Sequence, residues 1–418
     1  MNRVVVTGLG VVSPVGIGRE AFWSNLVDGQ SGIGPITLFD ASAFPVRIGG
    51  EVKDFDAAAV IDHFPQASDI RDRKVLLALA AAQEAVDDAA LPDEALDDAL
   101  LHVGVGLEEF CLADLTPYAH APDVVRAIAG SILDDQGDRP LQTPLDCTGN
   151  VLGRRYGFQG GRYTNCSACA AGTQVIGEAW QMLQEGPPPI ALVGATDSML
   201  NPLGLGGFGL LRVLSEENDR PQRACRPFDA SREGTVLGEG AAFLVMETSP
   251  HAETRHARIY AEVLGYASSL DAYRVSDPDP SGAGAVQSMR QALRSAGIDP
   301  REVDCVNAHA TGTPKNDVVE TAAIKQCLGR RAHEIPVHAV KSMTGHMIAA
   351  SGAVEAVAAV LTIRRRTVPP TINLVCPDQE CDLDYVANGA RPFSGRIVLS
   401  NSFGFGGQNA TVLLGRWD

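Results

Sequence analysis

The chain has 418 residues, 45% of them hydrophobic and 20% charged, which is enough for a substantial core in one large two-part fold or two domains. This balance excludes a largely disordered chain, and no apolar run reaches the roughly 20 residues of a membrane span. The formal net charge of −17 argues against bulk nucleic-acid binding, because phosphate neutralisation needs a basic face.

Strand and helix patterns alternate along the chain. In chain order they predict a strand at residues 3–7, a helix at 73–88, a strand at 101–105, a helix at 170–183, strands at 190–195, 241–246 and 257–264, a helix at 287–296, a strand at 305–308, helices at 318–327 and 354–363, and strands at 397–400 and 410–414. This alternation indicates an α/β fold with mixed sheets. The charged segment around 247–258 divides it into an N-terminal half, residues 1–250, and a C-terminal half, residues 251–418.

The cysteines and the N-terminus indicate the compartment. Nine cysteines, an odd number, are scattered between Cys111 and Cys381, whereas a secreted disulfide framework is denser and even. The N-terminal run MNRVVVTGLGVVSPVG is too short and too broken by glycine for a secretory signal, and it reads as a strand followed by a turn. We therefore expect a reducing, cytoplasmic setting.

Cys169 is the first candidate nucleophile. It stands in YTNCSACAAG, where a helical period begins, and the N–H groups at a helix N-terminus favour a thiolate. Two other interpretations stay open: a buried structural cysteine, and a redox pair with Cys166 at C-x-x-C spacing. A zinc site is disfavoured, because no second pair of ligands completes it.

Two histidines lie in similar loops downstream. His309 stands in NAHATGTPKNDVVE and His346 in VKSMTGHMIAASGAVE, each after a predicted strand and before a helix, where catalytic groups concentrate. Lys341 precedes His346 by five residues, and a lysine at the floor of the site would need a counter-charge, for which Glu320 is the candidate. On spacing alone, two unrelated surface charges are the favoured interpretation of this pair. The segment SNSFGFGGQN, residues 400–409, is a glycine-rich loop that can bring backbone N–H groups to an oxyanion.

Taken in order, these segments resemble the elongating β-ketoacyl-[acyl-carrier-protein] synthases nearly from end to end. The resemblance rests on RVVVTGLGVVSPVG, SACAAG, NPLGLGGFGLLRVLS, RPFDASREGTVLGEGAAFLVME, NAHATGTP, KSMTGHMIAASGAVE, TVPPTINL and NSFGFGGQN. It implies a thiolase-like fold, with two similar halves in α-β-α-β-α layers around mixed five-stranded sheets. It also implies an acyltransferase that condenses an acyl chain with a malonyl thioester of an acyl carrier protein.

The resemblance assigns a role to each candidate residue. Cys169 matches the acyl-carrying nucleophile, His309 and His346 the two histidines of the condensation step, Lys341 the active-site lysine and Glu320 its acidic partner. The gate of the glycine-rich loop is Phe405, whose backbone N–H would form the oxyanion hole with that of Cys169. The substrate pocket is expected to involve Leu107, Glu108, Phe208, Thr235, Thr311, Thr313 and Phe403.

Partners and cofactors also follow from the resemblance. The phosphopantetheine arm belongs to an acidic carrier protein, which is expected to dock on Arg71, Arg73, Lys74 and Arg212; no metal or diffusible cofactor is implied. The chain is expected to form a homodimer, or a heterodimer with a related ketosynthase-like subunit, without nucleic acid or membrane.

Departures from the family pattern bear on the pathway. Glu108-Glu109 replaces a usual Gly-Gly, and Thr235 stands where phenylalanine is usual, which widens or polarises the site. These differences suggest a specialised pathway such as polyketide or polyene assembly rather than housekeeping fatty-acid synthesis. Two alternatives from other classes stay open, namely a non-catalytic partner subunit and a C-x-x-C oxidoreductase.

Overall fold

The strands of the two halves of the chain follow one another in the same spatial order. The computed structural model describes residues 2–107, 121–123, 126–127, 130 and 144–418. Its strands are β1 (Val4–Ser13), β2 (Gly16–Ile17), β3 (Ile33–Pro35), β4 (Ile48–Gly50), β5 (Leu100–Val105), β6 (Arg162–Asn165), β7 (Ile190–Ser198), β8 (Glu239–Thr248), β9 (Ala261–Leu270), β10 (Cys305–Asn307), β11 (Val337–His338), β12 (Thr367–Val368), β13 (Arg391–Pro392), β14 (Ile397–Gly404) and β15 (Gln408–Gly415). Its α-helices are α1 (Arg19–Val27), α2 (Ala57–His63), α3 (Arg73–Ala89), α6 (Cys147–Tyr156), α7 (Ala171–Glu185), α8 (Pro202–Leu210), α9 (Ser249–Thr254), α10 (Ala283–Ala296), α11 (Pro314–Leu328), α12 (Lys341–Thr344) and α13 (Ser351–Arg365).

The large sheet is a pair of similar five-stranded sets. Its order is β11-β10-β14-β15-β9-β1-β8-β7-β5-β6. Read outward from the centre, both β1-β8-β7-β5-β6 and β9-β15-β14-β10-β11 have two antiparallel pairings followed by two parallel ones. The sets join where β1 pairs with β9 over only three residues, Val4–Val6. This repeat is the expected arrangement of two similar α/β halves.

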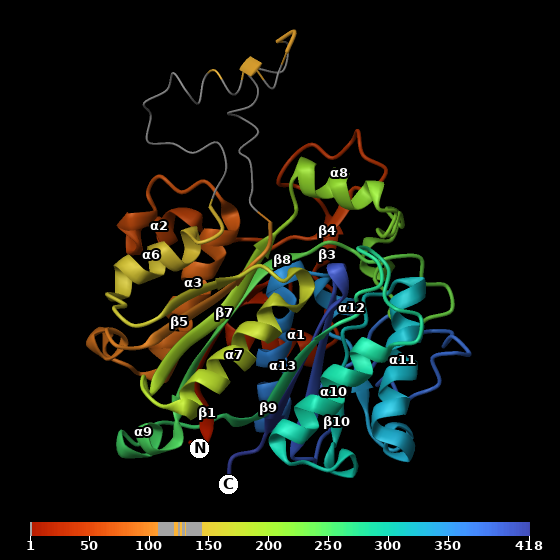
Figure 1. Cartoon of the computed structure of the whole chain (residues 1–418). Helices are drawn as coiled ribbons and strands as arrows, with labels where there is room; N and C mark the ends of the chain where they lie inside the picture. Colours follow the sequence, from red (N-terminus) through yellow and green to blue (C-terminus); the bar gives the residue numbers. More distant parts are fainter. Residues whose placement is uncertain (1, 108–120, 124–125, 128–129, 131–143) are drawn as a thin grey trace.

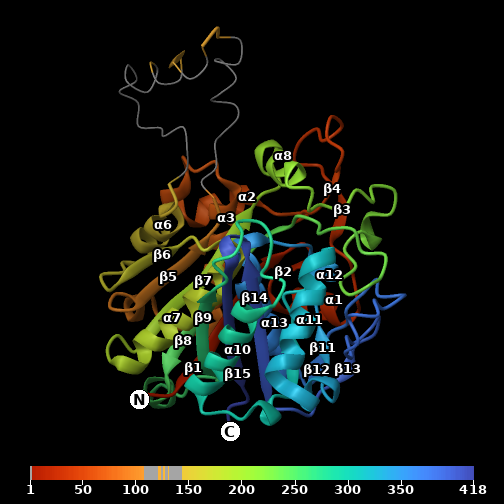
Figure 2. The same cartoon turned by 45° about the vertical axis from the view of Figure 1, so that its right-hand side comes forward.

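Two buried helices lie between the sets and carry the centre of the core. Helix α7 packs on β5 and β7 of one set and on β9 and β15 of the other, and α13 likewise packs on β1 and β8 and on β14 and β15. Every residue of α13 from Ser351 to Ile363 is buried, as expected of a helix covered on all sides. Helices α3 and α10 cover the outer faces (Figures 1 and 2). The α-β-α-β-α layering predicted from the sequence is confirmed.

Close helix packing explains why β1 runs further than predicted. The sequence predicts a strand at residues 3–7 and a turn at the following glycines, whereas β1 continues to Ser13. A Cβ on Gly8 would lie 2.2 Å from the carbonyl oxygen of Ala85, and one on Gly10 would lie 1.9 Å from that of Ala81, both in α3. These glycines therefore admit a helix against the strand rather than turning the chain.

Most other predicted elements lie within about three residues of their expected bounds. Helix α11 starts four residues earlier than predicted, at Pro314, where the side chain of Thr313 caps it by accepting from the N–H of Asn316. Strand β9 is displaced toward the C-terminus, to Ala261–Leu270, because the charged residues before it form a turn after α9. The edge strand β6 was not predicted, because its exposed residues have no apolar alternation.

Candidate active site

Cys169 lies where the chain turns into the buried helix α7. It belongs to the 3₁₀ turn Ala168–Ala170 and is 3% exposed. Ala168 has a φ of 49°, in the left-handed region that residues with a side chain rarely adopt. Such a turn aims the cysteine side chain off the helix axis and into the centre of the molecule.

Two glycines bring the second catalytic loop to this cysteine. A Cβ on Gly172 of α7 would lie 2.6 Å from the backbone nitrogen of Ala353, and a Cβ on Gly352 of α13 would lie 2.6 Å from that of Thr173. The N-terminal turns of α7 and α13 therefore touch backbone to backbone. Because His346 immediately precedes α13, this crossing sets its ring against Cys169. Gly172 therefore leaves room for helix α13 and not for a substrate.

His346 faces the Cys169 sulfur directly. Its Nε2 lies 3.1 Å from Sγ. On the other side of the ring, Nδ1 accepts a hydrogen bond from the backbone N–H of Ile348 at 3.2 Å and lies 3.0 Å from Ser351 Oγ. Because an N–H donor occupies Nδ1, we assign the proton of the neutral ring to Nε2.

His309 is held in the matching tautomer. It follows β10, and Lys341 Nζ donates to its Nδ1 at 3.2 Å. An ammonium only donates, so Nδ1 is the acceptor and Nε2 carries the proton. The rings of His309 and His346 have centroids 5.3 Å apart and stand at 84° to one another. The two imidazoles thus offer two Nε2–H donors in one site.

Burial and charge keep both rings neutral. Burial first, and then the Lys341 charge, hold the pKa of His346 well below its usual value. The same two causes, together with His346, depress the pKa of His309. Neutral imidazoles near pH 7 can donate hydrogen bonds to a developing oxyanion without protonating the carbon beside it.

The prediction that Glu320 is the acidic partner of Lys341 is wrong. Lys341, fully buried, forms its ion pair with Glu355 of α13. Glu320 of α11 instead accepts the backbone N–H groups of His309 at 2.8 Å and of Ala310 at 2.7 Å. Glu320 therefore fixes the His309 loop rather than neutralising the lysine. Burial raises the pKa of both carboxyl groups to about 7.

The glycine-rich loop closes over the sulfur. A Cβ on Gly404 would lie 3.1 Å from the backbone nitrogen of Cys169, so the loop touches the start of α7. Burial raises the pKa of the Cys169 thiol to about 11, while the backbone N–H groups of Phe405 and Cys169 and the Lys341 charge lower it. These two N–H groups are those predicted to form the oxyanion hole. The loop is anchored because Gly406 donates its N–H to the carbonyl of Val275 at 2.7 Å.

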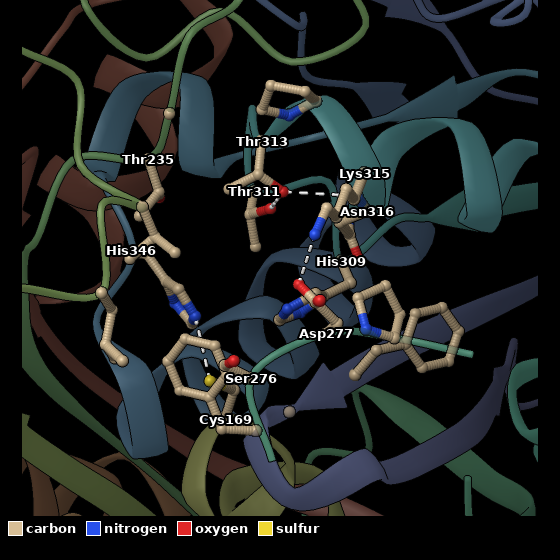
Figure 3. A pocket seen from close by; sticks show the side chains of 18 of the residues that line it. Cys169, Thr235, Ser276, Asp277, His309, Thr311, Thr313, Lys315, Asn316 and His346 are labelled. Atoms are coloured by element: carbon tan, nitrogen blue, oxygen red, sulfur yellow. Dashed lines mark hydrogen bonds and ion pairs between the residues drawn. The ribbon is translucent and has the colours of Figure 1, made fainter. Parts of the chain in front are cut away.

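A pocket of about 290 Å³ opens onto Cys169, His309 and His346 (Figure 3). Of the predicted pocket residues, five line it: Phe208, Thr235, Thr311, Thr313 and Phe403. Leu107 is not among the residues that line this pocket; it follows the end of β5 and is 65% exposed, and its place in the substrate pocket stays a prediction. Glu108 and Glu109 lie outside the described residues.

The predicted docking residues separate into different environments. Arg212 is exposed and lines the pocket, and docking of a carrier there stays a prediction. Lys74 is only 2% exposed and is paired with Asp72, so the prediction that it docks a partner is wrong. The guanidinium of Arg73 donates a hydrogen bond to the buried carboxylate of Glu239, and docking at Arg73 stays a prediction. Arg71 is exposed, and docking there stays a prediction.

The site also contains residues that the sequence did not single out. Ser351 and Glu355 position His346 and Lys341, and both lie in KSMTGHMIAASGAVE, where a helical turn carries them back toward the loop. The Cys166 thiol donates to the carbonyl of Gly106 at 3.4 Å, and the structure shows no disulfide between Cys166 and Cys169. Within the described part of the chain, no group of side chains is arranged to hold a metal ion, and no helix is long and apolar enough to cross a membrane.

A cysteine on a buried helix terminus, facing two neutral histidines beneath a loop of N–H donors, defines an acyl-transferring condensing enzyme of the thiolase-like fold. Family models agree: the β-ketoacyl synthase N-terminal domain matches residues 1–252, and the β-ketoacyl synthase C-terminal domain matches residues 260–375. The chain belongs to the β-ketoacyl synthase family.

Named relatives cover the whole chain. The chain is 41% identical to a 3-oxoacyl-[acyl-carrier-protein] synthase 2 of Synechocystis sp., over 98% of this chain and 97% of the relative. It is 42% identical to the protein of that name from Coxiella burnetii, over 99% of each. Among solved structures it is similar to the ishigamide ketosynthase/chain length factor, with a TM-score of 0.89, 35% identity and complete coverage of both chains. It is also similar to a type II polyketide ketosynthase solved with its acyl-carrier protein, with a TM-score of 0.86 and 32% identity over all of both chains. The chain is therefore a β-ketoacyl-[acyl-carrier-protein] synthase.

Proposed function

We propose that Cys169 carries the acyl chain and that His309 and His346 drive its decarboxylative condensation with a malonyl thioester. The observation that carries this assignment is the contact between Cys169 Sγ and His346 Nε2, with His309 in the same pocket. The arrangement divides the site into a nucleophile under N–H donors and a pair of neutral imidazole donors.

In the first half-reaction, the Cys169 sulfur attacks the thioester carbonyl of an acyl carrier. A carbon–sulfur bond forms to Cys169 while the bond to the carrier sulfur breaks, and the carrier thiol takes the proton that Cys169 loses. The N–H groups of Phe405 and Cys169 stabilise the tetrahedral oxyanion. Because burial raises the pKa of the thiol to about 11, those donors must offset the cost of forming thiolate during the attack.

In the second half-reaction, a malonyl thioester places its carbonyl oxygen against the Nε2–H groups of His309 and His346. Loss of CO₂ leaves an enolate, whose charge the two neutral donors stabilise. The enolate carbon bonds the acyl carbon of acyl-Cys169 and breaks its bond to sulfur. A 3-oxoacyl thioester departs, and the cysteine sulfur takes up one proton from solvent.

The partner of this site is an acyl carrier protein that docks at the mouth of the pocket. Arg212 supports this position, since it is exposed there and has no ion-pair partner among the described residues. The phosphopantetheine arm comes with the carrier in this proposal, and the two half-reactions described above use no metal or diffusible cofactor. We place the enzyme in the cytoplasm, which is supported by the eight cysteines of the described residues, because no two of them form a disulfide.

Assembly and pathway are part of the same proposal. We propose a dimer, formed with a second copy or with a related ketosynthase-like subunit. Two similar structures support this, since one is a ketosynthase/chain length factor and the other is a ketosynthase in complex with its acyl-carrier protein. A specialised polyketide or polyene pathway stays a prediction that rests on Thr235 and on Glu108-Glu109.

The test separates the two half-reactions with one variant. His309→Ala should still take up hexanoyl from a hexanoyl carrier but should lose both CO₂ release and the 3-oxooctanoyl product, measured by mass spectrometry after adding malonyl carrier. His333→Ala, at an exposed histidine outside the pocket, is the matched control and should behave as the wild type. Full condensation by His309→Ala would overturn the assignment, as would a wild type that takes up no acyl group from any donor or partner mixture.

A further inference from the structure

Thr235 is a polar residue in an unexpected place. It is 3% exposed and lines the same pocket wall as His346, across from Thr311 and Thr313 (Figure 3). Its backbone is fixed on both sides: its N–H donates to the carbonyl of Val213, and its carbonyl accepts the N–H of Ser215, each at 2.8 Å. The side chain is therefore held in a fixed position rather than carried on a free loop.

The hydroxyl of Thr235 has no hydrogen-bond partner among the described residues. Among the described residues, Thr235 is the one pocket-lining residue whose buried side-chain oxygen has no hydrogen-bond partner. The hydroxyls of the other two threonines of the pocket, Thr311 and Thr313, form a hydrogen bond with one another at 2.9 Å. A buried hydroxyl without a partner destabilises a protein, and an apolar side chain of the same shape would remove that cost. A partner that arrives with the substrate explains why the group is there.

The chain around Thr235 sets it beside the reacting atoms. The carbonyl of Val236, the next residue, accepts the N–H of His346 at 2.7 Å, and Gly238 donates its N–H to the carbonyl of His346 at 2.9 Å. Segment 235–238 is thus bonded to the residue that touches the Cys169 sulfur. A substrate group that meets Thr235 belongs to the reacting end of the substrate and not to a distant tail.

We propose that Thr235 is a specificity residue whose hydroxyl binds an oxygen atom carried close to the reacting carbons of the substrate. This inference rests on the condensation function proposed above and goes beyond it by naming the chemistry that the pocket selects. Two substrates supply such an oxygen: the carboxylate of the malonyl extender, and a 3-oxo group on an acyl chain. Thr235 therefore favours either decarboxylation of the malonyl extender or uptake of a 3-oxoacyl chain over uptake of an all-hydrocarbon acyl chain.

Thr235→Val keeps the shape of the side chain and removes only the hydroxyl, and Thr235→Ser keeps the hydroxyl. In one arm, kcat/KM for acyl uptake is compared between 3-oxohexanoyl and hexanoyl carriers. In the other arm, kcat/KM for CO₂ release from malonyl carrier is divided by kcat/KM for hexanoyl uptake by the same variant, which gives the malonyl ratio. Thr254→Val, on exposed helix α9, is the matched control. Thermal midpoints are measured for all variants without substrate.

We expect Thr235→Val to reduce one of these ratios about fivefold to tenfold, as the loss of one hydrogen bond does, and Thr235→Ser to restore it. A fall in the 3-oxohexanoyl ratio assigns the oxygen to the acyl chain, and a fall in the malonyl ratio assigns it to the extender. The thermal midpoint of Thr235→Val should be unchanged or higher. Unchanged ratios in both arms would overturn the proposal, as would equal losses on every substrate with a lower thermal midpoint. Failure of the condensation function would look different, because wild type itself would then be inactive.

Discussion

Removing the charge of Lys341 should raise the pKa of His309 and shift the acid limit of decarboxylation. Lys341 Nζ lies 3.2 Å from His309 Nδ1. At that distance and an effective dielectric constant of about 20, a proton on His309 is opposed by about 5 kcal/mol. An imidazolium spreads its charge over both nitrogens, which reduces this energy without changing its sign, so we expect Lys341→Met to raise the pKa of His309. Glu355 does not offset the change, because without Lys341 its buried carboxyl becomes more easily protonated.

The assay is CO₂ release from malonyl carrier by enzyme already acylated on Cys169, followed between about pH 4.5 and 8. Decarboxylation needs neutral His309, so its rate falls as pH drops through that pKa. Wild type should keep its rate well below pH 6.5, whereas Lys341→Met should lose it at higher pH. The variant should also be slower at every pH, because nothing then holds the proton of His309 on Nε2. Lys325→Met is the matched control, since Lys325 pairs with Asp382 and is not among the residues that line the pocket. A measurable Lys341→Met rate with the wild-type acid limit would refute the reasoning.

Three further predictions concern the groups around the nucleophile. Gly404→Ala should slow acyl uptake by Cys169 roughly tenfold, because the added Cβ pushes the loop away from the oxyanion site. Acyl uptake at the wild-type rate, measured by rapid-quench mass spectrometry, would contradict this. Glu320→Ala should lower the free energy of unfolding by about 3 kcal/mol, because it strips the N–H groups of His309 and Ala310 of their acceptor; urea titration showing a loss below about 1 kcal/mol would argue against it. Alkylation of Cys169 by iodoacetamide should keep rising from pH 7 to beyond about pH 9, because its raised pKa leaves little thiolate at neutral pH, and a plateau near pH 7 would be inconsistent.

The sequence predicted those parts of the site that depend on local pattern. Cys169 at a helix start and the two histidines in loops after strands could be recognised because periodicity and small residues mark those positions. Helix α13 could be predicted as a helix, but its complete burial could not, since that results from both five-stranded sets packing on it.

The sequence could not predict which side chains pair with one another across the fold. Glu320 and Glu355 both lie within fifteen residues of a catalytic group, and choosing the partner of Lys341 requires knowing which helix faces it. Lys74 illustrates the same point for surfaces: it stands beside exposed Arg71, yet it points inward to Asp72. The missing partner of the Thr235 hydroxyl is likewise a property of the folded pocket and not of any local motif.

If Cys169 carries the acyl group, the intact mass of the protein shows it after incubation with hexanoyl carrier. Wild type and Cys166→Ala should each gain the mass of one hexanoyl group, and Cys169→Ala should gain none. A gain that persists in Cys169→Ala, or one that disappears in Cys166→Ala, would contradict the account.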